Sequence, residues 1–113
     1  MKHHPIATPD QHAHELEALE LIERAIAISP DDPAIIDSLA WAQYKLGQYE
    51  EALENLRRAF AVFPDHEVAS HLGEVLWMLG KEEEATQVWE EALKETPSSD
   101  LIKEVMGRFQ LSR

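Results

Sequence analysis

The sequence predicts an all-α protein, a solenoid of about six antiparallel helices. Its long stretches are rich in Ala, Leu, Glu, Lys and Arg, which lose little side-chain entropy in a helix, and glycine occurs only four times in 113 residues. The segment 46–65, LGQYEEALENLRRAFAVFPD, is followed 33 residues later by the similar segment 79–98, LGKEEEATQVWEEALKETPS. Repetition at a fixed period of this length is typical of a helical solenoid.

The two copies agree at positions that matter for helix packing and helix termination. The matched pairs are Gly47 with Gly80, Glu51 with Glu84, Ala52 with Ala85, Leu56 with Trp89, Ala59 with Ala92 and Pro64 with Pro97. A third, partial copy lies 34 residues before the first, at Ala18, Ile22, Ala25 and Pro30. We therefore expect two full repeats, preceded by one orphan helix.

The orphan helix is expected over residues 9–29. Thr8 supplies an N-cap, Pro9 occupies the first turn, and Gln11 completes a capping box. Residues 1–8 precede this start and are expected to form a flexible tail. A single domain is expected to span 9–113.

The first full repeat, 33–65, is expected to hold helices over 33–46 and 49–62. Asp32 caps the first of them in front of Pro33, and Gly47 ends it because glycine accepts the left-handed conformation at the C′ position. Each helix has an apolar face with amphipathic spacing. The residues on these faces are Ile36, Leu39, Ala40 and Gln43, then Ala52, Leu53, Leu56, Ala59 and Phe60.

The second repeat, 66–99, follows the same plan, with helices over 66–79 and 82–95. Gly73, Ala85 and Ala92 are the small residues that should let this helix pair approach closely. A last helix is expected over 99–110, capped by Ser98 or Ser99, within a capping helix and tail that span 100–113.

At these positions the chain resembles the tetratricopeptide repeat (TPR) family, over roughly residues 14–110. The first helix of that repeat carries a large apolar residue, Leu-Gly and Tyr, and the second carries Ala, a large apolar residue, Ala and Pro. The matching residues are Ile36, Leu39, Ala40, Gln43, Ala52, Leu56, Ala59 and Pro64, then Ala69, Leu72, Gly73, Leu76, Ala85, Trp89, Ala92 and Pro97. Gln43 departs from the expected Tyr. The resemblance implies a protein–protein interaction module or scaffold that binds a peptide or helix of a partner in a concave groove.

Residues 37–60 are also similar to the last repeats of larger bacterial TPR proteins, including outer-membrane lipoproteins that serve as protease adaptors. That similarity implies a fragment of a longer array. The compartment stays open: cytoplasmic for the chain as written, periplasmic or membrane-anchored for a fragment of a lipoprotein.

The resemblance also implies which residues line the groove, because the second, fifth, ninth, twelfth and thirteenth residues of each repeat face it. They are Ala34, Asp37, Trp41, Tyr44, Lys45, Glu67, Ser70, Glu74, Trp77 and Met78, with Leu101, Glu104 and Arg108 from the last helix. Trp41, Tyr44, Trp77 and Met78 are expected to form an aromatic patch with acidic surroundings. The alternative is that Trp41 and Trp77 pack against neighbouring helices. Trp89 is expected in the core.

One class of TPR ligand does not suit this groove. TPR domains that clamp a chaperone's C-terminal carboxylate use Lys and Asn at the fifth and ninth groove positions. Those positions hold Asp37 and Trp41, then Ser70 and Glu74. The expected partner is therefore a neutral or basic protein segment with an apolar anchor.

Composition argues against several other functions. The net charge of −12 repels phosphate backbones, so no nucleic acid is expected as a partner. No apolar run approaches the ~20 residues that span a bilayer, so we expect no membrane insertion by this chain. There is no cysteine and no nucleophile or phosphate-loop motif. Consecutive acids such as Glu82 to Glu84 are explained by a helix N-terminus. We expect a protein that is not an enzyme and uses no cofactor.

The histidines do not predict a metal site. His12 and His14 point about 200° apart on a helix, and His3 and His4 fall in the expected tail. His71 has Glu67 four residues before it and Glu74 three after it, a spacing that is more often a solvated ionic face than a set of ligands.

A second hypothesis is a self-associating scaffold. The terminal helices lack a repeat partner, which would leave their apolar faces uncovered. These faces comprise Leu16, Leu19, Ile22 and Ile26 at one end and Ile102, Val105, Met106 and Phe109 at the other. Pairing between chains would then give a homodimer.

Overall fold

The structure, a computed structural model, describes residues 9–110, with side chains described from residue 16 onward. These residues form six helices and no strand, as the sequence predicts. The helices are α1 (Pro9–Ile28), α2 (Pro33–Lys45), α3 (Tyr49–Val62), α4 (His66–Met78), α5 (Glu82–Glu95) and α6 (Asp100–Gln110). Each bound lies within one residue of its predicted position. The predicted tail, residues 1–8, lies outside the described residues.

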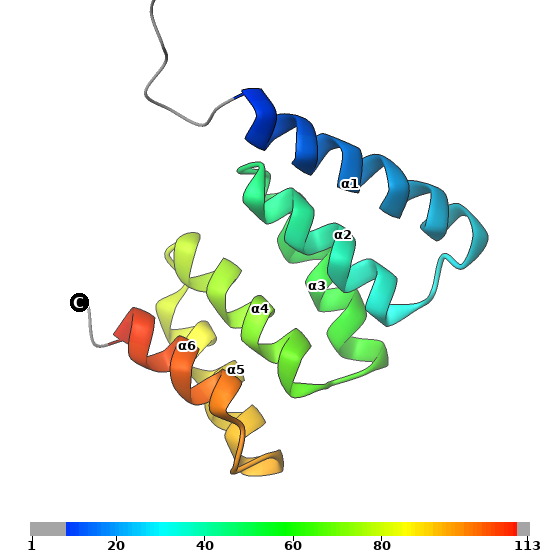
Figure 1. The fold of residues 1–113 in the computed structure, drawn as a ribbon. Helices are drawn as coiled ribbons and strands as arrows, with labels where there is room; N and C mark the ends of the chain where they lie inside the picture. The colour runs from blue at the N-terminus through cyan, green and yellow to red at the C-terminus, as the bar shows by residue number, and fades with distance from the viewer. Residues whose placement is uncertain (1–8, 111–113) are drawn as a thin grey trace, which may run out of the picture.

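The helices stack in chain order and form two layers. Helices α2, α4 and α6 lie side by side in one layer, with α3 and α5 behind them, and α1 lies against α2 at one end (Figure 1). We call the surface of the layer formed by α2, α4 and α6 the first-helix face. Within the described part of the chain, each helix contacts only its neighbours in this stack, which is the packing plan of a solenoid.

Glycines end α2 and α4 as predicted. Gly47 and Gly80 both adopt φ +84°, the left-handed region that glycine enters without steric cost. The N–H of the residue after each glycine donates to a carbonyl five residues back, Gln48 to Gln43 and Lys81 to Leu76, at 2.8 Å in both cases. Both ends are Schellman motifs, and they set the tight turn between the two helices of each repeat.

Each helix of the first-helix face starts at a side chain that caps its N-terminus. An Asp32 carboxylate oxygen accepts from the N–H of Ala34 at 3.0 Å, and Asp65 accepts in the same way from Glu67 at 3.1 Å. At α6 the cap is Ser99, whose buried Oγ accepts from the N–H of Ile102 at 3.2 Å. Ser99 also lies 2.7 Å from Nδ1 of His66, so this cap links the starts of α4 and α6.

The core is centred on Trp89, which is fully buried as predicted. Its indole rests on Gly73, where an added Cβ would overlap the ring atoms, and its Nε1 donates to the carbonyl of Ser70 at 3.4 Å. The absence of a side chain at Gly73 therefore makes the space that the largest core residue occupies. Ala85 and Ala92 are buried beside it, as the predicted close approach of α4 and α5 requires.

The expectation that α6 exposes an apolar face is wrong. Ile102 and Val105 are 0% exposed, and Met106 and Phe109 are partly buried against the core. The reason is that α6 packs into the angle between α4 and α5, so the last helix covers the second repeat within the same chain. It acts as the predicted capping helix.

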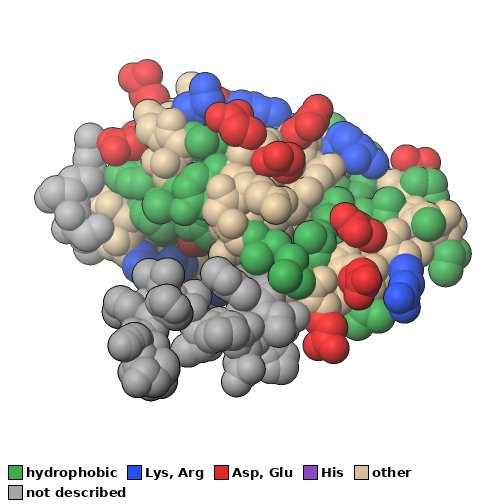
Figure 2. Space-filling view, turned by 90° about the horizontal axis from the view of Figure 1, so that it is seen from above, with side chains coloured by type: hydrophobic (Ala, Val, Ile, Leu, Met, Phe, Trp, Pro, Cys, Tyr) green, Lys and Arg blue, Asp and Glu red, His purple; other side chains and the backbone are tan. Residues whose placement is uncertain are grey.

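The other end of the stack is open. No side chain described in α1 is fully buried, and Leu16, Leu21 and Ile28 are exposed by 55%, 60% and 83%. Leu19, Ile22 and Ile26, predicted to be uncovered, are instead half-buried. Figure 2, which views the molecule from above, shows hydrophobic side chains at the surface between acidic ones. Among the described residues, no helix is long and apolar enough to cross a membrane.

Candidate partner-binding face

Trp41 occupies the middle of α2 on the first-helix face. Its indole stacks on the imidazole of His71 from α4, with centroids 4.1 Å apart and planes at 25°. It also contacts Tyr44 on its own helix at 4.9 Å between centroids, and Lys45 Nζ lies 5.8 Å from its ring centroid. Trp41 is half-buried, so one part of the indole packs and another part faces outward. Its role in binding a partner stays a prediction.

Two residues whose rings contact that of Trp41, His71 and Tyr44, each contact a carboxylate within the chain. Asp37 Oδ1 lies 2.9 Å from Nδ1 of His71, and their side chains are 13% and 18% exposed. Tyr44 donates its hydroxyl to Glu74 Oε2 at 2.8 Å, and Arg108 of α6 approaches the same carboxylate at 3.6 Å. These contacts join α2 to α4 and α4 to α6 through polar side chains.

The phenol of Tyr44 is held in its neutral form by this arrangement. Burial, the hydrogen bond to Glu74 and the negative charge of Glu74 all raise the pKa of Tyr44 well above its ordinary value. The hydroxyl consequently remains a donor to Glu74 throughout the physiological pH range. It therefore orients the buried Glu74 side chain.

Trp77 belongs to a second aromatic cluster, between α4, α5 and α6. Its ring centroid lies 5.9 Å from that of Trp89 and 6.0 Å from that of Phe109. Phe109 in turn lies 6.1 Å from Trp89 and carries the Arg108 guanidinium 5.2 Å from its ring centroid. Trp77 thus packs against neighbouring helices, which is the alternative weighed for it above.

The predicted groove residues fall into three classes of exposure. Ala34, Lys45, Glu67, Met78, Leu101, Glu104 and Arg108 are exposed. Asp37, Trp41, Tyr44 and Trp77 are half-buried. Ser70 and Glu74 are buried, at 4% and 7% exposed, so little of either side chain is accessible to a partner. The backbone carbonyl of Ser70 accepts from Trp89, and the Glu74 carboxylate contacts Tyr44 and Arg108.

The structure adds His71 to the face. The family register does not select it, because it follows the fifth position of its repeat rather than occupying it. Its spacing from Glu67, four residues, was the available signal, since residues at that spacing share one side of a helix. The sequence alone did not show that His71 contacts Asp37, because Asp37 comes from the adjacent repeat.

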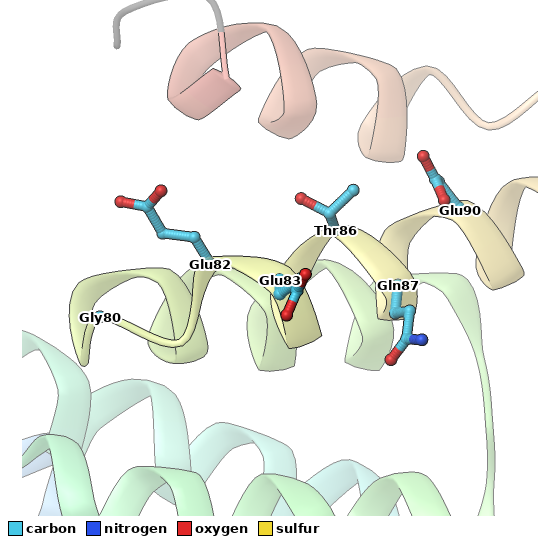
Figure 3. Close-up of a pocket in the computed structure, with 6 residues that line it drawn as sticks. All are labelled: Gly80, Glu82, Glu83, Thr86, Gln87 and Glu90. Carbon is cyan, nitrogen blue, oxygen red and sulfur yellow. The ribbon is translucent and has the colours of Figure 1, made fainter.

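A separate depression lies along α5, lined by Gly80, Glu82, Glu83, Thr86, Gln87 and Glu90. Its side chains do not converge: Glu82, Thr86 and Glu90 point toward α6, whereas Gln87 points away (Figure 3). Thr86 is already an acceptor for Gln110 at 3.0 Å. This surface therefore lacks the converging polar groups of a binding pocket.

Comparison with known proteins decides the family. Models described as tetratricopeptide repeat match residues 38–100 and residues 21–54. The chain belongs to the tetratricopeptide repeat family. This repeat is generally a protein–protein interaction module.

Among relatives of this TPR chain, a TPR repeat-containing protein of Pseudomonas aeruginosa is 53% identical over 58 residues, which cover 51% of this chain and 10% of that protein. The chain spans 10% to 25% of the length of the curated relatives it matches. A TPR protein of Thermus thermophilus has a TM-score of 0.79 at 22% identity, covering 93% of this chain and 53% of that one.

A second TPR structure shows the same fold with a ligand. The first TPR domain of Spaghetti (RPAP3), bound to the HSP90 peptide SRMEEVD, has a TM-score of 0.77 at 20% identity. The match covers 89% of this chain and 81% of that one. At this level of identity the likeness shows the fold alone.

Proposed function

We propose that this chain is a non-catalytic interaction module whose first-helix face binds a neutral or basic protein segment through an apolar anchor. The observation that carries the proposal is Trp41: a half-buried indole in the centre of α2, stacked on His71 and set among carboxylates. A tryptophan held rigid on one side and open on the other offers a large contact area at low entropic cost.

The charge of the face supports the choice of partner. Asp37, Glu67 and Glu104 all lie on it, and the whole chain carries a net charge of −12. The HSP90 peptide held by the RPAP3 domain contains two glutamates and an aspartate. A peptide of that kind would meet like charge here, whereas a segment with Lys or Arg near its anchor would meet complementary charge.

Exposed apolar side chains extend the surface beyond Trp41. Met78 is 44% exposed at the end of α4, and Leu101 is 37% exposed at the start of α6. Both occupy predicted groove positions. The proposed binding surface therefore consists of Trp41, Met78 and Leu101 as apolar contacts, with Glu67 and Glu104 as charged contacts at the rim.

The proposal is tested by selecting ligands from a displayed random-peptide library and measuring their affinity by fluorescence anisotropy. We expect selected peptides to combine an aromatic or aliphatic residue with nearby Lys or Arg, and to bind more weakly as salt rises. Trp41→Ala should weaken binding at least about tenfold, as expected for a central aromatic contact.

Phe63→Ala is the matched control, because Phe63 is an aromatic residue with surface area open to a ligand but lies at the end of α3, outside the first-helix face. The Phe63→Ala variant should bind the selected peptides with an affinity within twofold of that of the unmodified chain. Enrichment of acidic peptides, or equal losses in the two variants, would contradict the proposal.

A second candidate function is self-association, favoured by the exposed Leu16, Leu21 and Ile28 of α1. Light scattering across a range of concentrations distinguishes it. If α1 joins two copies, the chain should be a dimer and Leu21→Glu should restore the monomer mass.

A further inference from the structure

Three side chains of the metal-ligating type meet where α2 and α4 lie side by side. Glu67 and His71 come from α4, four residues apart and hence on one side of that helix. Asp37 comes from α2. One ligand atom of each residue lies within 4.8 Å of those of the other two. The three residues belong to two different repeats, so only the fold brings them together.

The spacing of these atoms suits a metal ion. His71 Nδ1 and Asp37 Oδ1 are 2.9 Å apart. Two ligands bound about 2.1 Å from one ion in adjacent positions lie about 3.0 to 3.4 Å from each other. The Asp37–His71 pair is therefore already near the separation that coordination requires. Glu67 is exposed, so its side chain is free to close the remaining distance.

The central ligand is held in place by its surroundings. The Trp41 indole stacks on the His71 imidazole at 4.1 Å and fixes the plane of the ring. The side chains of Asp37 and His71 are only 13% and 18% exposed. Partial exclusion of water strengthens attraction to a cation, and a fixed ring reduces the entropy lost on binding.

The ligand set indicates the class of metal. One imidazole nitrogen with two carboxylates suits Zn²⁺ and its neighbours, whereas Mg²⁺ prefers oxygen ligands alone. Three protein ligands also leave at least one position for water or for a donor from another molecule. We propose that Asp37, Glu67 and His71 bind a divalent transition-metal ion, with Zn²⁺ as the representative.

Metal binding would alter the first-helix face in two ways. The ion would link α2 to α4 across the boundary between repeats. It would also compensate the charge of two carboxylates beside Trp41, which would weaken the attraction of the face for basic segments. This inference does not depend on the proposed function, because the ion needs no protein partner.

The experiment is isothermal titration calorimetry of the full chain with ZnCl₂. Four histidines near the N-terminus could compete for the ion. The parent protein for these measurements therefore carries His3→Gln, His4→Gln, His12→Gln and His14→Gln. We expect one ion per chain. The midpoint temperature of thermal unfolding should rise when ZnCl₂ is added and return to its original value after EDTA is added, since a ligand that binds only the folded state stabilises that state.

Asp37→Asn in this parent should weaken Zn²⁺ binding at least tenfold, and His71→Gln should weaken it further. Asparagine keeps the size of Asp37 and the ability to accept from His71, so circular dichroism should show an unchanged fold. Glu104→Gln is the control, because it removes a carboxylate from the same face but not from the cluster. Its affinity should stay within twofold of the parent.

Three results would each overturn the proposal. The first is loss of Zn²⁺ binding when the four N-terminal histidines are replaced. The second is an affinity that Asp37→Asn leaves unchanged, which would place the ion at another histidine such as His66. The third is an equal response to MgCl₂, which would show general attraction to acidic residues without ligation by His71.

Discussion

At the scale of single residues, Gly73 and Trp89 show how one missing side chain determines the packing of a repeat. A Cβ at Gly73 would overlap the indole Nε1 of Trp89, which is fully buried and lacks space to withdraw. The two residues come from different helices of the same repeat. A substitution at either one therefore acts on the angle between α4 and α5.

We expect Gly73→Ala to lower the free energy of unfolding by about 1–3 kcal/mol, the usual cost of overpacking a core. Gly107→Ala is the matched control, because Gly107 is also helical but has open space around its missing Cβ. That variant should be stabilised by up to about 1 kcal/mol, since alanine favours the helix. Urea unfolding monitored by circular dichroism measures both. A Gly73→Ala variant as stable as Gly107→Ala would contradict the packing described.

The raised pKa of Tyr44 leads us to expect that the folded chain loses stability at alkaline pH. Burial and the hydrogen bond to Glu74 raise its folded-state pKa, so the folded chain holds the phenol proton more tightly than the unfolded chain. The resulting stability is fully present below the unfolded pKa of about 10 and is lost as the pH rises from there through the folded-state pKa. Urea midpoints measured between pH 8 and pH 11 should fall over the upper part of this range.

Tyr44→Phe separates this effect from general alkaline unfolding. The variant should lose about 1–2 kcal/mol at pH 8, because the Glu74 carboxylate loses its hydrogen-bond donor. Its midpoint should then fall less steeply above pH 10. Tyr49→Phe, which leaves the Tyr44 hydrogen bond intact, should keep the steep fall. Identical alkaline slopes in the unmodified chain and Tyr44→Phe would show that the hydroxyl is not the titrating group.

At the scale of helices, the two ends of the stack differ in how firmly they are held. Helix α6 buries Ile102 and Val105 completely, and its first turn is tied to α4 through Ser99 and His66. Of the five other described helices, α1 packs against α2 alone, and it has no fully buried side chain among residues 16–28. The energy of local opening should therefore differ greatly between them.

We expect the backbone amides of α1 to exchange with deuterium orders of magnitude faster than those of α4, at a denaturant concentration far below the unfolding midpoint. Amides of α6 should be protected nearly as well as those of α4. Hydrogen exchange followed by mass spectrometry after peptic digestion resolves the three helices. Equal protection of α1 and α4 would mean that α1 is covered, for example by a second copy of the chain.

At the scale of the whole molecule, the fold was predictable because the repeat itself encodes it. Matched glycines at 47 and 80 predicted the turns, and both have the predicted positive φ. The position of α6 was not predictable from the period, since a repeat pattern shows which helices are similar but not which face the last one uses. Its burial depends on the fit of Phe109 against Trp77 and Trp89, which are distant in sequence.

The binding face was predictable only in part for a related reason. The family register assigns Trp41, Tyr44 and Asp37 to the groove, and this role stays a prediction. The register did not predict that Ser70 and Glu74 are buried, because it assigns a direction to each position and ignores the size of neighbouring side chains. Trp89 donates to the backbone carbonyl of Ser70, and Tyr44 donates to the Glu74 carboxylate, which Arg108 also approaches.

The stacking of helices only against their neighbours has a mechanical consequence. Among residues 9–110, no contact joins α1 or α2 to α5 or α6, so a pulling force applied at the two ends of this region passes through each interface in turn. The weakest interface should yield first. Under tension in an optical trap, α1 should detach at low force and the α4–α5–α6 unit at a higher one, so the chain would lengthen in separate steps.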